Sequence, residues 1–323
     1  MKKTVVGILF GGKSAEHEIS LLSAKNIIEA IDKEKFDPVP VKIDKTGEWE
    51  IKDLKSIPVD VVFPILHGPF GEDGTVQGLL KIADIPFVGP GVLGSAVGMD
   101  KDVMKRLLRD AGLPIGKFLV QKSHEKPISF DEVKTALGNP FFIKPANMGS
   151  SVGISKVRSE AEYTAALKDA FQYDTKIVIE EFIPGREIEC AVLGNETPIA
   201  SVPGEIIPIH DFYSYDAKYI DDKGASLEIP AKLDEQTVKR IQELSIKVFQ
   251  TLCCEGLSRV DFFLKENNQL VINEINTMPG FTKISMYPKM FEATGVSYTE
   301  LITRLIELAM ERFGKERGLK TQK

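Results

Sequence analysis

Two apolar segments near the end of the chain, 258–264 and 270–276, carry polar side chains whose spacing could do chemistry. If the two asparagines between them form a two-residue turn, the segments pair as antiparallel strands and Asp261 lies directly opposite Glu274. Carboxylates in that position repel each other, and a hard divalent cation such as Mg²⁺ would remove the repulsion. The hairpin therefore predicts a metal site, with a solvated polar face as the alternative. The same face of the hairpin also holds Arg259 and Asn276.

A second pattern is the segment 7–14, which fits the phosphate-binding sequence GxxxxGK[ST]. In that motif a glycine-rich turn presents backbone amides to phosphate. Here Ile8, Leu9 and Phe10 occupy the positions of the turn, and they are typical of the interior of a strand. We therefore interpret the match as a buried strand; the alternative is a P-loop nucleoside triphosphatase that uses Lys13.

A third pattern, the segment 89–94, fits GxGxxG after an apolar stretch. Dinucleotide binding would also need an uninterrupted helix after the glycines and an acidic residue for the ribose. Gly98 and a new helix start at Asp100 interrupt such a helix. A glycine-permitted loop is the better interpretation, and a nicotinamide oxidoreductase remains a weak alternative.

The elements that must position these residues follow from the hydrophobic periodicity. The first hundred residues alternate between strand and helix patterns, which is typical of parallel βαβ units. In this part the expected strands are 5–10, 39–43, 59–66 and 85–88, and the expected helices are 19–31 and 75–83.

The rest of the chain divides into two further units. Asp100 is a suitable N-cap for a helix that Gly112 ends, and Ser297 with Glu300 forms a capping-box pattern before the last helix. We expect three units, 1–99, 100–185 and 186–323, in an α/β fold that is α+β in its second and third units. Other expected elements are the strands 141–144 and 177–182, a polar loop at about 203–226 and a helix at 234–252.

Composition limits the class of protein. The 323 residues are 43% hydrophobic and 27% charged, which is typical of a globular chain. The net charge of −6 lacks the basic excess of a nucleic-acid-binding protein. Three cysteines, two of them adjacent, do not form a disulfide framework and fit a reducing compartment. No apolar segment approaches the ~20 residues of a membrane span, and we interpret the first apolar run as a strand rather than a signal peptide.

The ordered motifs resemble the ATP-grasp carboxylate–amine ligases, and within them the D-alanine–D-alanine ligase family. The resemblance runs from about Thr4 to Phe313. It implies an ATP-grasp fold behind an N-terminal parallel βαβ domain. The motifs that carry it are Gly11–Ser20, His67–Thr75, Met99-Asp100-Lys101, Lys144-Pro145, Gly149–Gly153, Tyr215–Tyr219 and Asn273–Thr282.

The reaction implied by the resemblance joins two D-alanines at the expense of ATP. The first carboxylate attacks the γ-phosphate to give an acyl phosphate, and the amine of the second D-alanine then displaces phosphate. The protein's part is to position the reactants and stabilise charge. Relatives that make D-alanyl-D-lactate or D-alanyl-D-serine are the nearest alternative, and a non-catalytic binding module is a more distant one.

The resemblance also implies residue roles on the nucleotide side. Asp261, Glu274 and Asn276 would bind two Mg²⁺ or Mn²⁺ ions. The phosphates would meet Lys101, Lys144, Ser151 and Lys218, and the small residues of the loop 149–151 would let backbone amides approach them. Adenine would lie against Glu180, Glu181 and Ile183, with Glu187 on the ribose.

On the amino-acid side, the resemblance places Glu16 on the ammonium of the first D-alanine, with His67 in the same subsite. Arg259 and the Gly280 amide would stabilise the oxyanion, and Ser285 with Met286 would bind the second D-alanine. In the loop 211–222, which would close over the site, Tyr219 would hydrogen-bond Ser150, which in turn bonds Glu16. The expected setting is a cytoplasmic homodimer that supplies peptidoglycan precursors.

Overall fold

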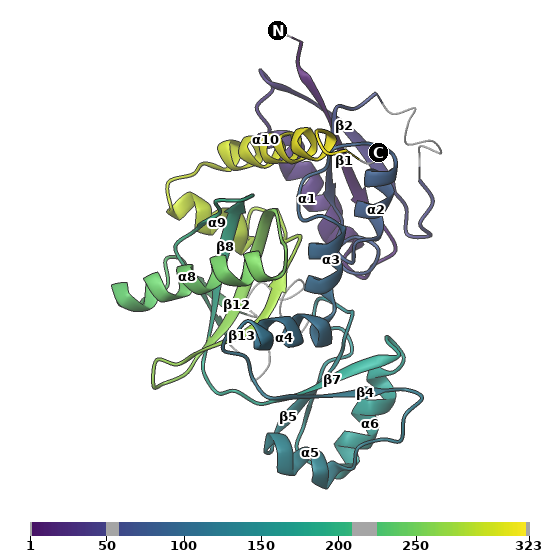
Figure 1. Cartoon of the computed structure of the whole chain (residues 1–323), viewed down its shortest axis with the longest axis vertical. Coiled ribbons are helices and arrows are strands. Elements are labelled where there is room, and N and C mark those ends of the chain that lie inside the picture. Colours follow the sequence, from purple (N-terminus) through teal and green to yellow (C-terminus); the bar gives the residue numbers. More distant parts are fainter. Residues whose placement is uncertain (1, 50–57, 209–224, 321–323) are drawn as a thin grey trace.

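The computed structural model describes residues 2–49, 58–208 and 225–320. Within these ranges the chain builds three β-sheets, each with its own helices (Figure 1). The first sheet is parallel, in the order β2-β1-β3, as the alternating pattern predicts. Its strands are β1 (Thr4–Gly11), β2 (Phe36–Ile43) and β3 (Val61–Ile65), and its helices are α1 (His17–Ala30), α2 (Thr75–Ile82) and α3 (Val92–Met99).

The second sheet is antiparallel, in the order β4-β7-β5-β6. Two helices cover one of its faces, and their apolar side chains form a separate core with Phe141, Ile143, Ile177 and Ile179 (Figure 1). Its elements are β4 (Phe118–Lys122), α5 (Phe130–Leu137), β5 (Phe141–Pro145), β6 (Ser155–Val157), α6 (Glu160–Ala170) and β7 (Lys176–Glu181).

The third sheet is also antiparallel and follows the order β11-β10-β8-β12-β13, with β9 paired to β8. Its strands are β8 (Arg186–Gly194), β9 (Ile199–Ala200), β10 (Gly204–Pro208), β11 (Ala225–Glu228), β12 (Gly256–Leu264) and β13 (Leu270–Asn276). The helices that accompany it are α4 (Lys101–Asp110), α8 (Glu235–Thr251), α9 (Met286–Ala293) and α10 (Tyr298–Arg317).

Helix packing does not follow chain order. Helix α4 packs into the core of the third sheet through Met104 and Leu108. Helix α10 returns to the first sheet, where Leu301 and Leu305 share a core with Phe63 (Figure 1). The first and third sheets are therefore joined by one core, whereas the second sheet keeps its own.

The local signals at helix ends are mostly confirmed. Asp100 caps α4 by accepting from the amides of Asp102 and Val103. Ser297 caps α10 by accepting from the Glu300 amide, but the Glu300 carboxylate pairs with Arg304 instead of completing a capping box. The expected strand at 85–88 is wrong, since only Phe87 makes a bridge, to Val62. The segment 7–14 is strand through Gly11, which supports its interpretation as a buried strand.

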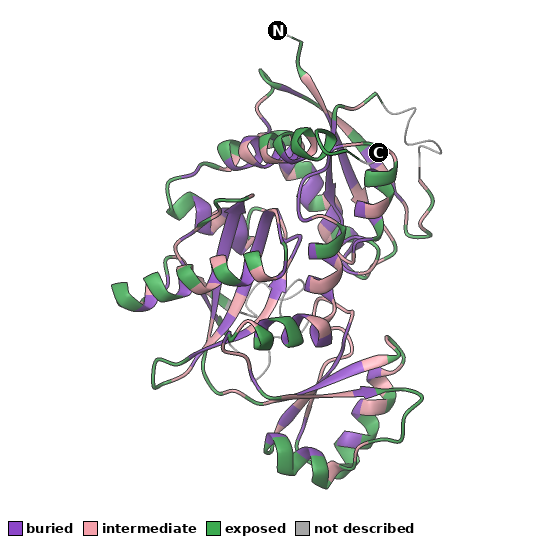
Figure 2. Cartoon of the chain, in the orientation of Figure 1, coloured by how far each residue is buried: buried purple, intermediate pink, exposed green. Residues whose placement is uncertain are grey.

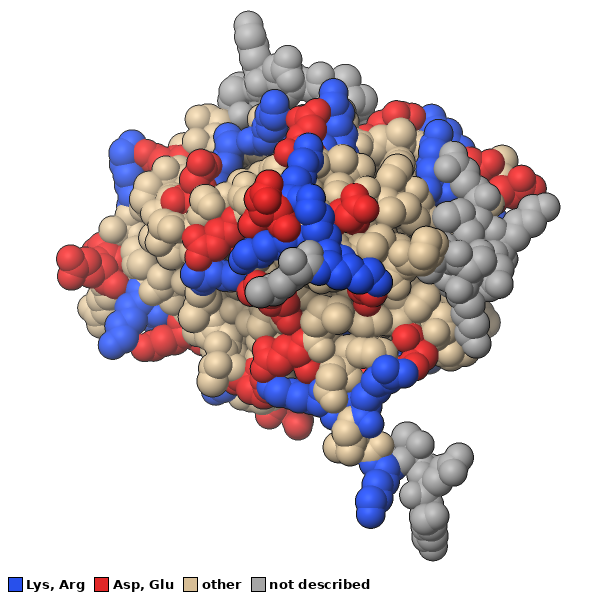
Figure 3. All heavy atoms as spheres, turned by 90° about the horizontal axis from the view of Figure 1, so that it is seen from above, with Lys and Arg blue, Asp and Glu red and all other residues tan. Residues whose placement is uncertain are grey.

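Surface properties agree with the composition. Buried residues concentrate on the strands, and helices such as α8 expose their outer sides (Figure 2). On the face drawn in Figure 3, both acidic and basic side chains are present, and the basic ones near its centre are flanked by acidic ones. In the described part of the chain, no helix combines the length and the apolar character that a membrane span requires. Cys190, Cys253 and Cys254 are all free thiols.

Candidate active site

A cavity of about 1330 Å³ lies where the three sheets meet. Its walls come from the start of α1, from β5 and β7, and from β12 and β13. Within the described ranges, every residue that the sequence predicts for the site lines this cavity, with the exception of Asp261. These residues are Glu16, His67, Lys101, Lys144, Ser150, Ser151, Glu180, Glu181, Ile183, Glu187, Arg259, Glu274, Asn276, Gly280, Ser285 and Met286.

Two other predicted residues, Lys218 and Tyr219, lie outside the described residues, as does the rest of the loop 211–222. Asp261 is described and sits directly behind the cavity wall. Its carboxylate accepts two hydrogen bonds from Arg259 and one from Asn276, both of which line the cavity.

Two buried lysines reach the cavity from different elements. Lys101 begins α4, and its Nζ donates to the Met148 carbonyl at 2.8 Å. Lys144 lies near the end of β5, and its Nζ is 2.7 Å from Glu180 Oε2. Burial opposes a charge on Lys144, but the carboxylates of Glu180 and Glu274 raise its pKa above the ordinary value. A fixed cation at this position suits an anionic ligand.

Glu180 is held between two cations. Lys105, one turn after Lys101 on α4, lies 3.2 Å from Glu180 Oε1. Burial would raise the pKa of Glu180, but Lys105 and Lys144 lower it to about 2. The sequence pattern did not single out Lys105, although an (i, i+4) neighbour of a site lysine faces the same side of its helix.

The loop after β5 has an unusual backbone. Ser150 and Ser151 both have positive φ, 52° and 60°, which side-chain-bearing residues rarely adopt. Backbone strain of this kind concentrates at ligand sites, where the fold holds it in place. The loop Ala146–Gly153 therefore has the small residues and the specialised conformation of a ligand-binding turn.

The carboxylate hairpin forms with the expected pairing at the site. Asp261 pairs with Glu274, and Arg259 with Asn276. The turn differs from the prediction, because Asn268 takes positive φ in a loop that Lys265 and Gln269 close. Because of this turn, the pairs next to it, from Phe262 to Leu264, differ by one residue from the expected register. A bulge after Asp261 restores the expected register at Asp261 and Arg259.

Arg259 is clamped by two carboxylates. Its guanidinium makes two 2.7 Å hydrogen bonds to Asp261, and its Nε is 2.9 Å from Glu189 Oε2. Burial would lower the pKa of Arg259, but Asp261 and Glu189 raise it well above the ordinary value. Glu189 was missed by the sequence pattern, although its two-residue spacing from Glu187 places both on one face of β8.

The hairpin residues fit a hard cation. Two facing carboxylates and an amide share one face, and Lys101 and Arg259 provide positive charge beside them, with Lys101 Nζ 3.6 Å from Glu274. Among the described residues, no group of three or more Asp, Glu, His or Cys side chains forms a metal cage. A cation here would therefore take further ligands from phosphate and water, as Mg²⁺ usually does.

The opposite wall of the cavity comes from the first sheet. Glu16 is the N-cap residue of α1 and is 8% exposed. His67 follows β3, and its Nδ1 lies 3.1 Å from the Met278 carbonyl. Glu72, which the sequence pattern did not select, accepts from the amides of Gly68 and Met278. Burial and the Glu16 charge raise the pKa of Glu72 to about 8.

The loop after β13 completes this wall. His67 and Glu72 both hold Met278, so the first unit fixes the path of the chain toward Gly280. Ser285 is the N-cap residue of α9, and its Oγ accepts from the Thr282 amide at 2.9 Å. Met286 lies in the core below, with its edge in the cavity wall.

Burial of His67 makes stability depend on pH. Burial lowers the pKa of His67 below its ordinary value of 6.5, and Nε2 has no hydrogen-bond partner among the described residues. Below pH 6.5 the unfolded chain binds a proton that the folded protein resists, so stability falls with falling pH. We expect His67→Gln to lose less melting temperature than the wild type between pH 7 and pH 5.5. The exposed His124→Gln is the matched control, and an equal loss in wild type and His67→Gln would contradict the expectation.

The cavity lies where two antiparallel sheets meet a parallel one, and it is lined by lysines and carboxylates that suit a nucleotide. Solved relatives identify this architecture as the ATP-grasp class. The structure of the D-alanine–D-alanine ligase from Coxiella burnetii matches with a TM-score of 0.89 and 37% identity, over 98% of this chain and 97% of that one. The D-Ala:D-Ser ligase VanG from Enterococcus faecalis matches with a TM-score of 0.87 and 37% identity, over 95% of this chain and all of that one.

Sequence comparisons narrow the class. The model of the D-ala D-ala ligase C-terminus matches residues 107–307, and that of the N-terminus matches 5–57 and 50–90. The D-alanine–D-alanine ligase of Oceanobacillus iheyensis is 54% identical over all of this chain and 99% of its own length. D-alanine–D-alanine ligase A of Escherichia coli K12 is 51% identical over 99% of this chain and all of its own length. The chain belongs to the D-alanine–D-alanine ligase family.

Proposed function

We propose that this protein joins two D-alanines into D-alanyl-D-alanine while ATP is converted to ADP and phosphate, for peptidoglycan precursor synthesis. The first D-alanine carboxylate takes up the γ-phosphoryl group. The amine of the second D-alanine then attacks the acyl carbon, and the phosphate leaves with the original carboxylate oxygen. The observation that carries this proposal is that one cavity is lined by two buried lysines that suit phosphate, by Arg259, and by Glu16 and His67.

On the nucleotide side, we assign the phosphates to Lys101, Lys144 and the loop that contains Ser151. The adenine lies between Glu180, Glu181 and Ile183, and Glu187 accepts from the ribose hydroxyls. These residues all line the same cavity, which supports a single extended ligand. The Glu180 carboxylate is already paired with Lys105 and Lys144, so it would bind the adenine amine in addition to these two lysines.

On the metal side, Asp261, Glu274 and Asn276 would hold two divalent ions, Mg²⁺ or Mn²⁺. When bound, the ions neutralise charge on the phosphates. Arg259 would turn its guanidinium toward the oxyanion while Glu189, whose Oε2 is 2.9 Å from Arg259 Nε, still holds it.

On the amino-acid side, Glu16 binds the ammonium group of the first D-alanine, and His67 lies in the same subsite. Arg259 and the Gly280 amide stabilise the oxyanion of the tetrahedral intermediate. Ser285 binds the carboxylate of the second D-alanine above Met286. Both subsites are supported by the placement of these residues around one cavity.

The loop 211–222 is proposed to close over the site, with Lys218 on the γ-phosphate and Tyr219 on Ser150. Exclusion of water would protect the acyl phosphate from hydrolysis. The loop would start and end beside the cavity, because Ile206 on β10 and Leu227 on β11 both line it.

We further propose that the protein is a cytoplasmic homodimer that pairs through its N-terminal unit. Large apolar side chains are exposed on neighbouring helices α2 and α3, among them Ile82 at 85% and Leu93 at 60%. Free thiols fit a reducing compartment. Sedimentation equilibrium that gives the mass of one chain would contradict the dimer.

The alternative function is a ligase that uses D-serine or D-lactate as its second substrate. The similarity to the D-Ala:D-Ser ligase supports the D-serine form of this alternative. Tyr219 in the sequence Ala217-Lys218-Tyr219 resembles the dipeptide-forming branch. We expect Tyr219→Phe to raise the share of D-alanyl-D-lactate when D-alanine and D-lactate compete. Chromatography of the products measures this, and an unchanged ratio would contradict the role of Tyr219.

The function itself is tested by phosphate release from ATP with and without D-alanine. We expect release to require D-alanine and to match the amount of dipeptide formed. ATP turnover that is indifferent to D-alanine would exclude the proposal, and a preference for D-serine would select the alternative.

A further inference from the structure

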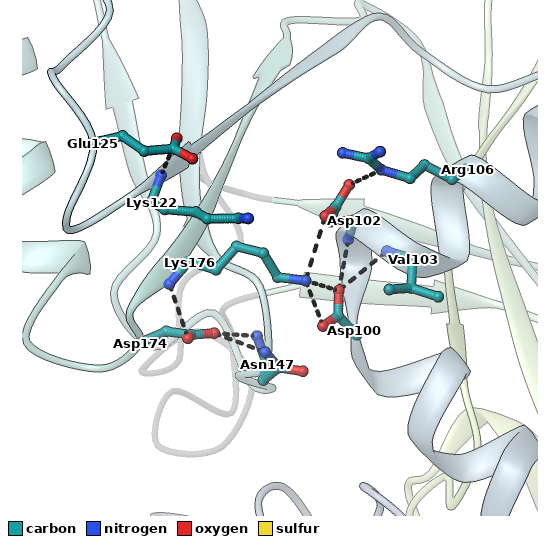
Figure 4. A network of polar contacts seen from close by, with 9 residues as sticks. All are labelled: Asp100, Asp102, Val103, Arg106, Lys122, Glu125, Asn147, Asp174 and Lys176. Carbon is teal, nitrogen blue, oxygen red and sulfur yellow. Dashed lines mark hydrogen bonds and ion pairs between the residues drawn. The ribbon is translucent and has the colours of Figure 1, made fainter.

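A partly buried ion cluster lies outside the cavity, between β7 and the start of α4 (Figure 4). Lys176 Nζ donates to both carboxylate oxygens of Asp100, at 2.8 and 2.7 Å, and to Asp102 Oδ2 at 3.3 Å. The side chains of Lys176 and Asp100 are 18% exposed and that of Asp102 only 8%. None of the three lines the cavity.

The cluster joins two separately packed bodies. On one side, Met104 and Leu108 anchor α4 in the core of the third sheet. On the other side, Ile177 and Ile179 anchor β7 in the core of the second sheet. The nucleotide wall of the cavity is built from both sheets, so Lys176 bridges the two halves that would grip ATP.

Backbone hydrogen bonds tie the same residues to the phosphate-binding parts. The Ala146 amide donates to the Lys176 carbonyl, and the Lys101 amide donates to the Ala146 carbonyl, each at 3.0 Å. Asn147, the next residue of the loop, is held by Asp174 at 2.8 and 2.9 Å (Figure 4). A movement of α4 away from β7 would therefore displace Lys101 from the loop Ala146–Gly153.

We infer that Lys176 is a positioning residue: its ion pairs with Asp100 and Asp102 fix the separation of the two halves of the nucleotide cleft and so hold Lys101 against the loop Ala146–Gly153. The inference rests on the proposed function, because it assumes that the cleft binds ATP. It concerns a residue that does not itself contact the nucleotide.

The charges explain why the cation matters. Without Lys176, Asp102 keeps a second partner in Arg106, but among the described residues Asp100 keeps only the amides that it caps. Without Lys176, partly buried negative charge would draw in water and open the contact between α4 and β7. We expect Lys176→Met to raise the Kd for Mg-ADP about tenfold, since a partly buried ion pair is broken. At saturating ATP, kcat should change by less than about twofold, because the reacting groups remain.

Calorimetric titration with Mg-ADP, together with KM for ATP and kcat, tests the inference. Lys176→Arg keeps the cation and should restore tight binding. Asp100→Asn keeps a capping oxygen but loses the charge, so it should weaken binding even if Lys176→Met fails to fold. The matched control is Lys81→Met, which removes an exposed ion pair with Glu316 on the surface and should bind like the wild type.

Three outcomes would overturn the inference. A wild-type Kd in folded Lys176→Met or in Asp100→Asn would show that the cluster does not position the cleft. A loss of kcat without a change in KM would place the effect on chemistry instead. If the wild type did not bind Mg-ADP, both the proposed function and the inference would be contradicted. If the wild type bound Mg-ADP tightly and the variants bound it equally well, only the inference would be contradicted.

Discussion

Glu274→Gln should abolish turnover while the protein stays folded. Glutamine matches glutamate in size but has no charge, so it is a poor ligand for a hard cation. Glu274 faces Asp261 across the hairpin, and Lys101 Nζ lies 3.6 Å from its carboxylate. The measurement is D-alanine-dependent phosphate release over a range of Mg²⁺ concentrations, with circular dichroism to verify the fold.

The control for this variant lies on the same hairpin. Glu266→Gln removes an exposed carboxylate from the turn and should leave turnover unchanged. Wild-type activity in Glu274→Gln at low Mg²⁺ would show that the facing carboxylates do not bind the metal. Loss of activity in both variants would instead indicate a general effect of charge on the hairpin.

Arg259→Lys should lower kcat by roughly 10² to 10³, the usual effect of removing one stabilising group from an oxyanion site. Lysine keeps the positive charge between Asp261 and Glu189, so the buried carboxylates stay compensated. It lacks the planar fork that lets arginine bind a carboxylate and an oxyanion together. Binding of Mg-ADP should change little, because Arg259 is not assigned to the nucleotide.

An arginine on the neighbouring strand provides the matched control. Arg186 on β8 makes a two-pronged ion pair with Glu205, at 2.8 and 2.6 Å, and does not line the cavity. Arg186→Lys should therefore keep wild-type kcat. If Arg259→Lys also kept it, the oxyanion role of Arg259 would be excluded; if its Kd for Mg-ADP rose in proportion to the loss of kcat, the residue would serve the nucleotide instead.

The hairpin shows how far sequence reasoning reaches. The assumed turn placed Asp261 opposite Glu274, and period-two alternation placed Arg259 and Asn276 on the same face; both placements are confirmed, although the turn itself was wrong. The actual turn displaces the pairs next to it by one residue, and the bulge after Asp261 restores the expected register beyond it. The two differences therefore cancel at the site. Bulges depend on the neighbouring strands, and a single strand's sequence does not reveal them.

Other features needed the tertiary structure. Lys105, Glu72 and Glu189 look like ordinary surface charges in the sequence, but packing buries them next to predicted site residues. Helix α10 has the pattern of an ordinary amphipathic helix, and that pattern does not reveal that the helix packs on the first sheet. Strong local signals, such as the Asp100 cap and the parallel first sheet, were predictable because neighbouring residues determine them.

The most direct test of the account follows oxygen through the reaction. D-Alanine with ¹⁸O in both carboxylate oxygens is incubated with the protein, ATP and Mg²⁺, and the released phosphate is analysed by mass spectrometry. A path through D-alanyl phosphate predicts one ¹⁸O atom in the phosphate for each D-alanyl-D-alanine formed, because the attacking carboxylate oxygen leaves with phosphorus. Phosphate without ¹⁸O, or labelled phosphate without dipeptide, would contradict the proposed ligation.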